Sequence, residues 1–160
     1  MRISICLCIC GILASGVPTA AQQPAAPTAS MAVKAGFEEV SGWLAKAAAL
    51  VPADKYTYKP VATVRSFGEQ MAHVADGMNW YCGSASAAKD TQWSDAVEKA
   101  GTTKDKVVAA LKAATDNCAK AYASPTARIH RLMGGVAHAN LHYGNAITYL
   151  RMLGLTPPSS

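Results

Sequence analysis

Apolar residues recur at the spacing of one helical face in four separate segments of this chain. In the second segment, Phe67 is followed by apolar residues four, seven, eleven and fourteen positions later, which places them on one side of a helix. The four segments are residues 31–50, 66–83, 103–123 and 128–151. No segment alternates apolar and polar residues with the period of a β-strand. The pattern therefore predicts an all-α fold, a four-helix bundle around one hydrophobic core.

Residues that begin or end helices flank these segments. Ser66 and Glu69 form a capping-box sequence, in which each side chain accepts a hydrogen bond from the backbone N–H of the other residue. Ser30 is a candidate N-cap for the first helix, and Pro125 suits the first turn of the last helix. Gly154 is suited to the position just after a helix end. These signals agree with the boundaries that the apolar spacing predicts.

The first 21 residues are typical of a secretory signal peptide. A positive charge near the start is followed by the apolar residues 3–13 and then by small residues that suit a cleavage site. We therefore expect a signal peptide at 1–21, a tether rich in Pro, Ala and Gln at 22–29, and one bundle domain at 30–160. The mature protein would be exported to the periplasm or secreted. A lipoprotein or an uncleaved anchor is the alternative.

The sequence after the signal peptide argues against two classes of partner. Lysines and arginines are scattered singly, with no run of four, although the formal net charge is +5. Because a nucleic-acid-binding protein needs a basic patch or stripe, we expect no nucleic-acid partner. No later stretch is continuously apolar over the roughly 20 residues that a transmembrane helix requires. We therefore expect no membrane span.

The histidines suggest a metal site. His138 and His142 are four residues apart, so both imidazoles lie on one face of the last helix and can reach a single ion. Imidazole commonly binds zinc, nickel and iron, and a catalytic zinc usually has three protein ligands. His73, in the second helical segment, is the best candidate for the third ligand. Residue 139 is Ala rather than Glu, so the metalloprotease pattern HExxH is absent.

Each histidine also has a purely structural interpretation. A single histidine beside an apolar stripe is more often a hydrogen-bonded core residue than a ligand, and a lone HxxxH pair occurs readily in a helical chain. His130 lies two helical turns before His138, which is too far for the two to share an ion. The spacing alone therefore leaves open whether the chain binds a divalent metal.

Four further residues are candidates for the surroundings of such a site. Asp76 is three residues from His73, and Asn145 is three residues from His142, so either side chain can orient an imidazole. A solvated helix carboxylate is the favoured alternative for Asp76. Trp80 and Tyr143 would line a pocket next to the histidines, or they are simply core aromatics.

Two cysteines, Cys82 and Cys118, remain after removal of the signal peptide. In an oxidising compartment two such thiols often pair, and both are expected near helix ends. They are therefore a candidate disulfide. The alternative is that they are two small buried apolar residues.

The chain resembles the DinB-like superfamily, which includes the YfiT-like metal-dependent hydrolases and thiol-dependent transferases. The resemblance rests on two runs, VRSFGEQMAHVADGMNWYC (residues 64–82) and AHANLHYGNAITYLRMLGLTPPSS (residues 137–160). It covers essentially the whole mature chain and implies a four-helix bundle with up-down-down-up connections. The long connections at 51–64 and 89–102 are compatible with crossovers of this kind.

The resemblance also implies a ligand set. The family's metal site combines one histidine on the second helix with an HxxxH pair on the fourth, and these positions are His73, His138 and His142 here. Members often carry an acidic residue just before the last histidine, where this chain has Leu141. An acid–base residue at that position is therefore missing.

The function that the resemblance implies is that of a metal-dependent enzyme, a hydrolase or a thiol transferase, in which the ion activates a water or a thiol against a small-molecule substrate. Export weighs against thiol transfer, because low-molecular-weight thiols belong mainly to reducing compartments. The alternative is a non-catalytic bundle that binds a metal or a small ligand. Dimers are common in such bundles, so the resemblance also allows a homodimer.

Overall fold

The computed structural model describes residues 27–160, so the expected signal peptide and most of the expected tether lie outside the described residues. These residues form five α-helices, one short 3₁₀ helix and no strands. The α-helices are α1 (Ala29–Leu50), α2 (Phe67–Ser86), α3 (Ala96–Ala100), α4 (Lys104–Ala123) and α5 (Ile129–Met152), and the 3₁₀ helix η1 spans Ala53–Lys55. The all-α bundle predicted from the sequence is confirmed, with α3 as an added short helix.

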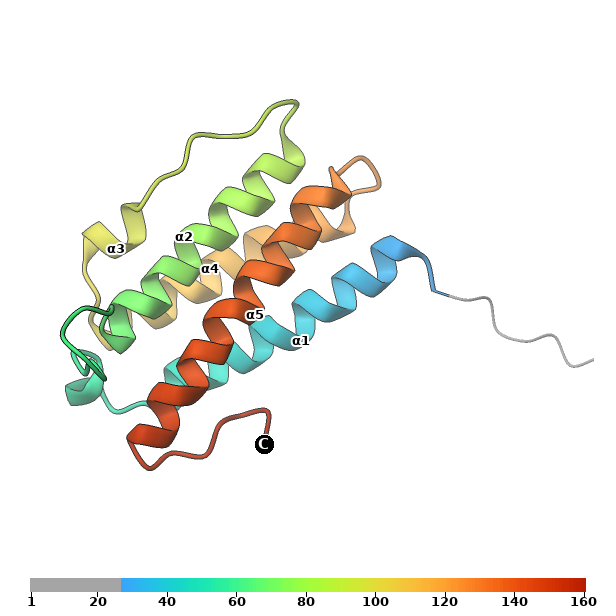
Figure 1. The fold of residues 1–160 in the computed structure, drawn as a ribbon. Coiled ribbons are helices and arrows are strands. Elements are labelled where there is room, and N and C mark those ends of the chain that lie inside the picture. The colour runs from blue at the N-terminus through green and yellow to red at the C-terminus, as the bar shows by residue number, and fades with distance from the viewer. Residues whose placement is uncertain (1–26) are drawn as a thin grey trace, which may run out of the picture.

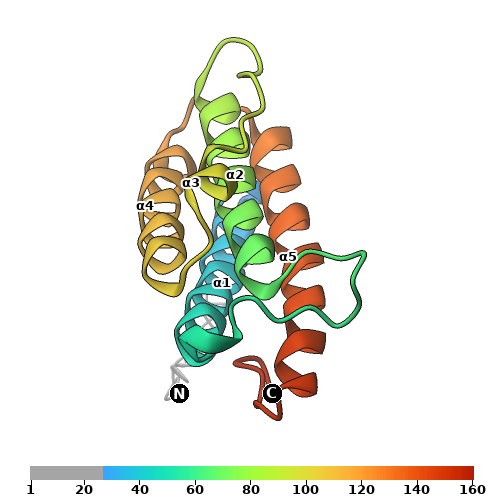
Figure 2. The same cartoon turned by 90° about the vertical axis from the view of Figure 1, so that its left-hand side faces the viewer.

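The four long helices lie side by side as a bundle (Figures 1 and 2). Both α2 and α1 pack against α4 and α5, so α1 and α2 occupy opposite corners of the bundle. Following the colours in Figure 1, α2 and α4 run in one direction while α1 and α5 run in the other. The helix directions are therefore up, down, down, up, and the metal-ligand candidates on α2 and α5 come from neighbouring antiparallel helices.

The crossover between α2 and α4 passes back along the outside of the bundle, because these two helices run in the same direction (Figure 1). At its start, the Asp90 carboxylate accepts hydrogen bonds from the guanidinium groups of Arg128 and Arg131. The backbone N–H of Arg128 donates to the carbonyl of Ala85 at 2.9 Å. These contacts fix the crossover against the adjacent ends of α2 and α5, and α3 follows from it beside α2.

Side-chain caps begin α1 and α2, whereas α3, α4 and α5 have no side-chain cap hydrogen bond. The last helix starts at Ile129, so Pro125, expected in its first turn, lies in the turn before it. Ser66 and Glu69 form the predicted capping box at the start of α2, with both reciprocal hydrogen bonds present. The first helix begins at Ala29, two residues earlier than expected, because Thr28 is its N-cap and accepts a hydrogen bond from Met31. Ser30, the expected cap, already lies inside the helix.

The core lies between the four long helices. Its largest fully buried side chains include Leu44 of α1, Phe67 and Met71 of α2, and Leu150 of α5. The Tyr56 hydroxyl is buried and donates to the carbonyl of Ala48 at 2.6 Å, which holds the 51–66 connection against the bundle. The apolar stripes that the sequence predicts are thus the faces that the helices bury.

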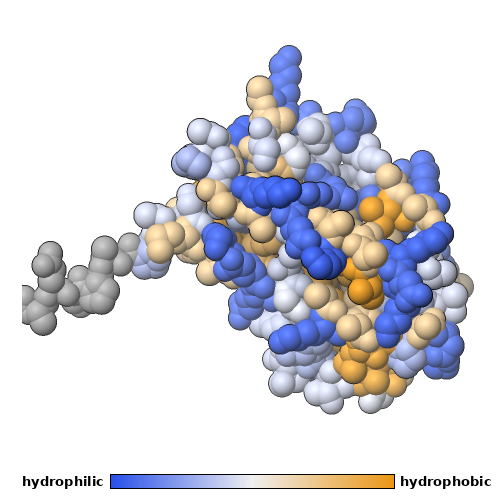
Figure 3. All heavy atoms as spheres, turned by 180° about the vertical axis from the view of Figure 1, so that it is seen from behind, coloured by the Kyte–Doolittle hydropathy of each residue, from blue (hydrophilic) through white to orange (hydrophobic). Residues whose placement is uncertain are grey.

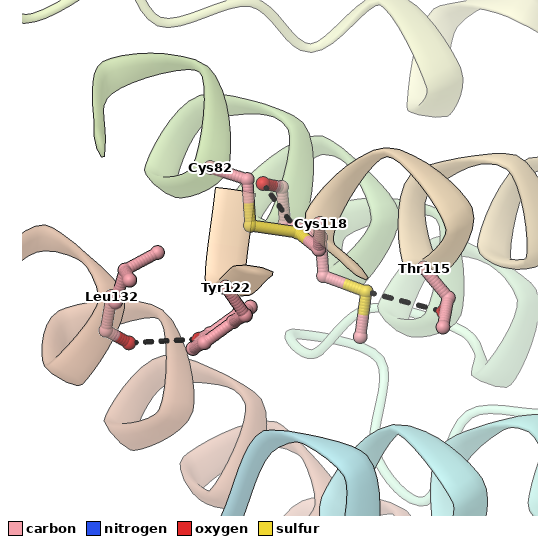
Figure 4. The surroundings of a disulfide bond; sticks show 6 residues. Cys82, Thr115, Cys118, Tyr122 and Leu132 are labelled. Carbon is pink, nitrogen blue, oxygen red and sulfur yellow. Dashed lines mark hydrogen bonds between the residues drawn. A yellow bond between two sulfur atoms is a disulfide. The ribbon is translucent and has the colours of Figure 1, made fainter. Parts of the chain in front are cut away.

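A disulfide joins Cys82 of α2 to Cys118 of α4, with 5.2 Å between the Cα atoms (Figure 4). Both residues are buried, and their helices are neighbours. Next to it, the Tyr122 hydroxyl donates to the carbonyl of Leu132 at 2.9 Å and so connects α4 to α5. Of the two alternatives for the cysteines, the structure contains the bridge.

Charged and polar side chains separate small apolar patches over the face shown in Figure 3. Within residues 27–160, no helix is both long enough and apolar enough to cross a membrane.

Candidate metal centre

His73 of α2 and His138 and His142 of α5 converge at the surface between the two helices. One ring nitrogen from each lies within 4.8 Å of the others, and Nε2 of His73 is 3.4 Å from Nε2 of His138. The three side chains are half-buried, so the group is reachable from outside. His130 is exposed and lies outside the group. Three imidazoles gathered in this way can hold a metal ion.

A glycine makes room for the central imidazole. A Cβ at Gly77 of α2 would lie 2.6 Å from Nδ1 and 3.1 Å from Nε2 of His138, which is closer than side chains approach one another. Any larger residue would therefore push the ring away from His73. The close approach accounts for a helix-weakening glycine in the middle of α2.

The surroundings lower the pKa of all three imidazoles and so favour their neutral form. Burial, together with the neighbouring His142 and His73, lowers the pKa of His138 to about 4. Burial, His73 and Arg65 likewise lower the pKa of His142 to about 4. The pKa of His73 is lowered by burial and by Arg65, while Glu98 and Asp76 oppose that shift. Because only neutral imidazole binds a metal, these shifts favour the ligating form of the group.

Glu98 of α3 lies on the outer side of His73. Its Oε2 is 3.9 Å from Nδ1 of His73, while its Oε1 accepts a hydrogen bond from Nε of Arg65 at 3.0 Å. A carboxylate behind the distal nitrogen of a ligating histidine orients the ring and raises its basicity. Glu98, which no sequence pattern singled out, occupies this position.

Asp76 does not contact His73 as the sequence spacing suggested. Its buried carboxylate accepts hydrogen bonds from the backbone N–H groups of Val97 at 2.9 Å and Glu98 at 3.0 Å. Two free amides of the first turn of α3 are thereby satisfied. Asp76 therefore holds α3, and with it the carboxylate of Glu98, against α2. Asp76 is therefore neither the residue that orients His73 nor a solvent-exposed carboxylate, the two roles expected from the sequence.

The partner of His142 is Gln70 rather than Asn145. The side-chain amide of Gln70, on α2, is 2.5 Å from Nδ1 of His142. In the structure the amide nitrogen of Gln70 faces Nδ1, which leaves Nε2 as the ring nitrogen that a metal can reach. A metal on Nε2 would place the proton on Nδ1, and the Gln70 amide would then have to be flipped so that its oxygen accepts that proton. Asn145 is exposed and lies in a neighbouring cavity.

The expected pocket aromatics are separated by the fold. Tyr143 is buried on the side of α5 that faces α1. Its ring stacks on that of Trp43 with 5.3 Å between the ring centroids, and its hydroxyl donates a hydrogen bond to the hydroxyl of Ser159 at 3.0 Å. The expectation that Tyr143 lines the site is thus corrected: one residue past His142, it points about 100° away around the helix. Trp80 stays near the site, with its indole N–H donating to the carbonyl of Thr91.

Two other aromatic rings border the histidines. The ring of Trp93, from the crossover, is 5.5 Å from that of His73, and the ring of Tyr81 is 5.5 Å from that of His138. Trp80 lies between them, 6.1 Å from Trp93 and 4.7 Å from Tyr81. One side of the site is therefore an aromatic wall, which lowers the local polarity next to the imidazoles.

The opposite side opens into a cavity of about 480 Å³ between the 60–65 loop and α5. It is lined by Pro60, Thr63, Val64, Arg65, Gln70, His142, Asn145, Thr148 and Tyr149. His142 is thus shared between the metal centre and the cavity. A ligand in the cavity would lie directly beside the metal-ligand candidates.

Comparison with family models, with curated proteins and with solved structures gives no match for this chain. The function is therefore argued from the site itself.

Proposed function

We propose that the protein is a metal-dependent enzyme in which His73, His138 and His142 hold one divalent metal ion. The observation that carries the proposal is the convergence of three half-buried imidazoles from two helices, with ring nitrogens within 4.8 Å of one another. A resemblance to the DinB-like superfamily, whose triad falls on the same three residues, agrees with it. The proposed reaction is hydrolysis or thiol transfer on a small molecule.

The surroundings of the histidines fit a bound cation. Glu98 lies behind His73, and Gln70 contacts His142, so two of the three ligands have a partner on the nitrogen that a metal does not use. Because the pKa values of His138 and His142 are lowered, protons compete little with a metal ion for these two imidazoles at neutral pH. Three nitrogen ligands leave coordination positions for other groups.

When bound there, a divalent ion supplies Lewis acidity, which lowers the pKa of a water or thiol nucleophile. The chain's own residues then have separate tasks. Glu98 places a negative charge 3.9 Å from Nδ1 of His73, which raises the basicity of that ligand. The aromatic wall of Trp80, Tyr81 and Trp93 limits access of bulk water from one side, and the cavity on the other side admits a substrate.

A non-catalytic metal-binding bundle is the second candidate. The observation that favours it is that the nearby carboxylates already have partners: Asp76 holds the amides of α3, and Glu98 pairs with Arg65. No acidic residue precedes His142, where this chain has Leu141. A dedicated general base is thus absent from the described residues around the site.

Export to the periplasm or secretion belongs to the same proposal. It is supported by the character of residues 1–21 and by a disulfide between Cys82 and Cys118, since such bridges persist mainly in oxidising compartments. Hydrolysis is therefore favoured over transfer of a cytosolic thiol. A homodimer, which the resemblance allows, would be tested by the mass of the protein in solution.

Elemental mass spectrometry of the purified mature protein tests the metal site. We expect about one divalent ion per chain in the wild type and in His130→Ala, and loss of that ion in His73→Ala and His138→Ala. Circular dichroism establishes that each variant is folded. Equal metal content in all four proteins, or none after incubation with zinc, nickel and iron(II), would refute the site.

A cobalt-loaded sample separates the two candidate functions. An enzyme needs an open coordination position, so addition of a small thiol or of azide should change the visible spectrum of the cobalt ion. An unchanged spectrum would indicate a closed, four-ligand site and favour the non-catalytic bundle.

A further inference from the structure

Arg65 is the only formally charged residue that lines the cavity next to His142. The other lining side chains are apolar, hydroxyl or amide groups, together with the imidazole of His142. The cavity volume, about 480 Å³, is in the range of pockets that hold small organic molecules. The charge that a ligand in the cavity meets directly is therefore that of Arg65, which also pairs with Glu98 outside the lining.

Only one edge of the Arg65 guanidinium is used within the protein. Its Nε donates to Glu98 at 3.0 Å, and in residues 27–160 no other acceptor lies within hydrogen-bonding distance of the group. A guanidinium carries five N–H donors in a fixed planar arrangement that suits a carboxylate or phosphate. The Nη groups of Arg65 are left to bind a second anion.

Two contacts tie the exposed Arg65 to the surroundings of the metal centre. Its backbone carbonyl accepts a hydrogen bond from the Tyr149 hydroxyl of α5 at 2.7 Å, and its side chain pairs with Glu98, which in turn lies behind His73. Arg65 thus joins the cavity to the imidazole group.

Two neutral side chains complete the anion-binding surface. Asn145 and Thr148 are exposed on the α5 side of the cavity, and within the described part of the chain neither side chain has a hydrogen-bond partner. Both can donate to an oxygen of a ligand. Donors from α5 therefore face the same space as the guanidinium of Arg65.

We propose that the cavity selects an anionic substrate, whose carboxylate or phosphate group pairs with Arg65 while the rest of the molecule extends toward His142. The inference rests on the proposed function, because it names the class of substrate for the metal centre. A charged anchor of this kind places the reacting group beside the metal ligands and holds it there.

The test is a titration of zinc-loaded and zinc-free protein with succinate, inorganic phosphate and the neutral analogue succinamide, followed by two-dimensional NMR. We expect succinate or phosphate to shift the amide signals around Arg65, Gln70 and Asn145, and succinamide to leave them unchanged. Whichever anion binds more tightly identifies carboxylate or phosphate as the preferred group.

Variants of Arg65 decide the outcome. Loss of a charge-assisted pair should weaken anion binding by about 10- to 100-fold in Arg65→Gln. The anion affinity of Arg65→Lys, which keeps the charge, should lie between those of Arg65→Gln and the wild type. Lys112→Gln on α4 is the control, because it also removes one positive charge. Equal anion affinity in Arg65→Gln and wild type, absence of anion binding to the wild type, or equal binding of succinamide would overturn the inference.

Zinc content measured on the same samples keeps the two proposals apart. Arg65→Gln should retain zinc, because Arg65 is not a ligand. Failure of the wild type to bind zinc would refute the metal centre, whereas the zinc-free titration would still report whether Arg65 binds the anion.

Discussion

The Asp76 carboxylate accepts a hydrogen bond from the backbone N–H of Glu98 at 3.0 Å, although the two residues are 22 positions apart. Through this contact a buried side chain of α2 fixes a short helix whose own carboxylate lies 3.9 Å from His73. The candidate metal centre is therefore supported from outside the bundle by an element that a four-helix pattern does not contain.

Replacing Asp76 should release α3. In Asp76→Ala, the N–H groups of Val97 and Glu98 lose their acceptor, which should lower the free energy of unfolding by about 1–3 kcal/mol. Hydrogen exchange at these two amides should accelerate. Asp95→Ala is the control, because the Asp95 side chain makes no capping hydrogen bond to α3 and its stability change should stay within about 0.5 kcal/mol. Unchanged exchange at Val97 would contradict this role of Asp76.

Replacing Glu98 should weaken metal binding without removing a ligand. Loss of an orienting carboxylate typically lowers metal affinity by about 10- to 100-fold, so Glu98→Gln should show this decrease in a competition titration with a zinc chelator. Glu38→Gln, on the exposed face of α1, is the matched change and should bind zinc as the wild type does. An affinity within twofold of wild type in Glu98→Gln would remove Glu98 from the site.

Gly77→Ala should separate metal binding from folding. The new Cβ would collide with the ring of His138, so metal affinity should fall at least about tenfold. Alanine has a higher helix propensity than glycine, which should offset the loss of folding stability from this collision by about 1 kcal/mol. Gly144→Ala on α5 meets no atom within 4 Å and should keep the metal. Thermal unfolding and metal content should be measured for both variants and compared with the wild type. Full metal content in Gly77→Ala would show that the ring can move without leaving the site.

The disulfide should stabilise the bundle without contributing to the metal centre. The bridge closes a loop of 36 residues that contains the crossover, for which the chain-entropy model gives about 4 kcal/mol. The double variant Cys82→Ser/Cys118→Ser should therefore unfold at lower denaturant concentration but retain its metal. Alkylation without reductant should leave the mass of the wild type unchanged. Two added alkyl groups would show that the thiols are free.

The metal-free protein should lose stability as the pH falls from 6.5 towards 4. In this window the unfolded chain protonates its histidines near pH 6.5, whereas His138 and His142 stay neutral in the native state down to about pH 4. Because the unfolded state binds more protons, the free energy of unfolding decreases with falling pH and this contribution levels off below pH 4.

Denaturant unfolding at pH 7 and pH 5 measures this dependence. His138→Ala should show a smaller difference between the two pH values than the wild type, while His130→Ala should match the wild type. Identical pH dependence in His138→Ala and wild type would mean that His138 titrates normally in the folded protein.

Much of the fold follows from local sequence. The apolar spacing in residues 66–83, together with the Ser66 and Glu69 capping box, specifies α2, since both signals act within a few residues. The four-residue interval between His138 and His142 likewise places two imidazoles on one helical face before any packing occurs. Helix identity and the pairing of these two residues are thus determined by short-range interactions.

The surroundings of the site depend on contacts between distant segments. Gln70 lies 72 positions from His142, and Glu98 reaches His73 only because Asp76 holds α3 in place. Tyr143, beside His142 in sequence, is turned into the core because successive helical residues differ in direction by about 100°. The sequence by itself determined the four long helices and the histidine pair on the last of them. The tertiary structure decided which side chains complete the centre, because those contacts arise from packing between helices rather than from spacing within one.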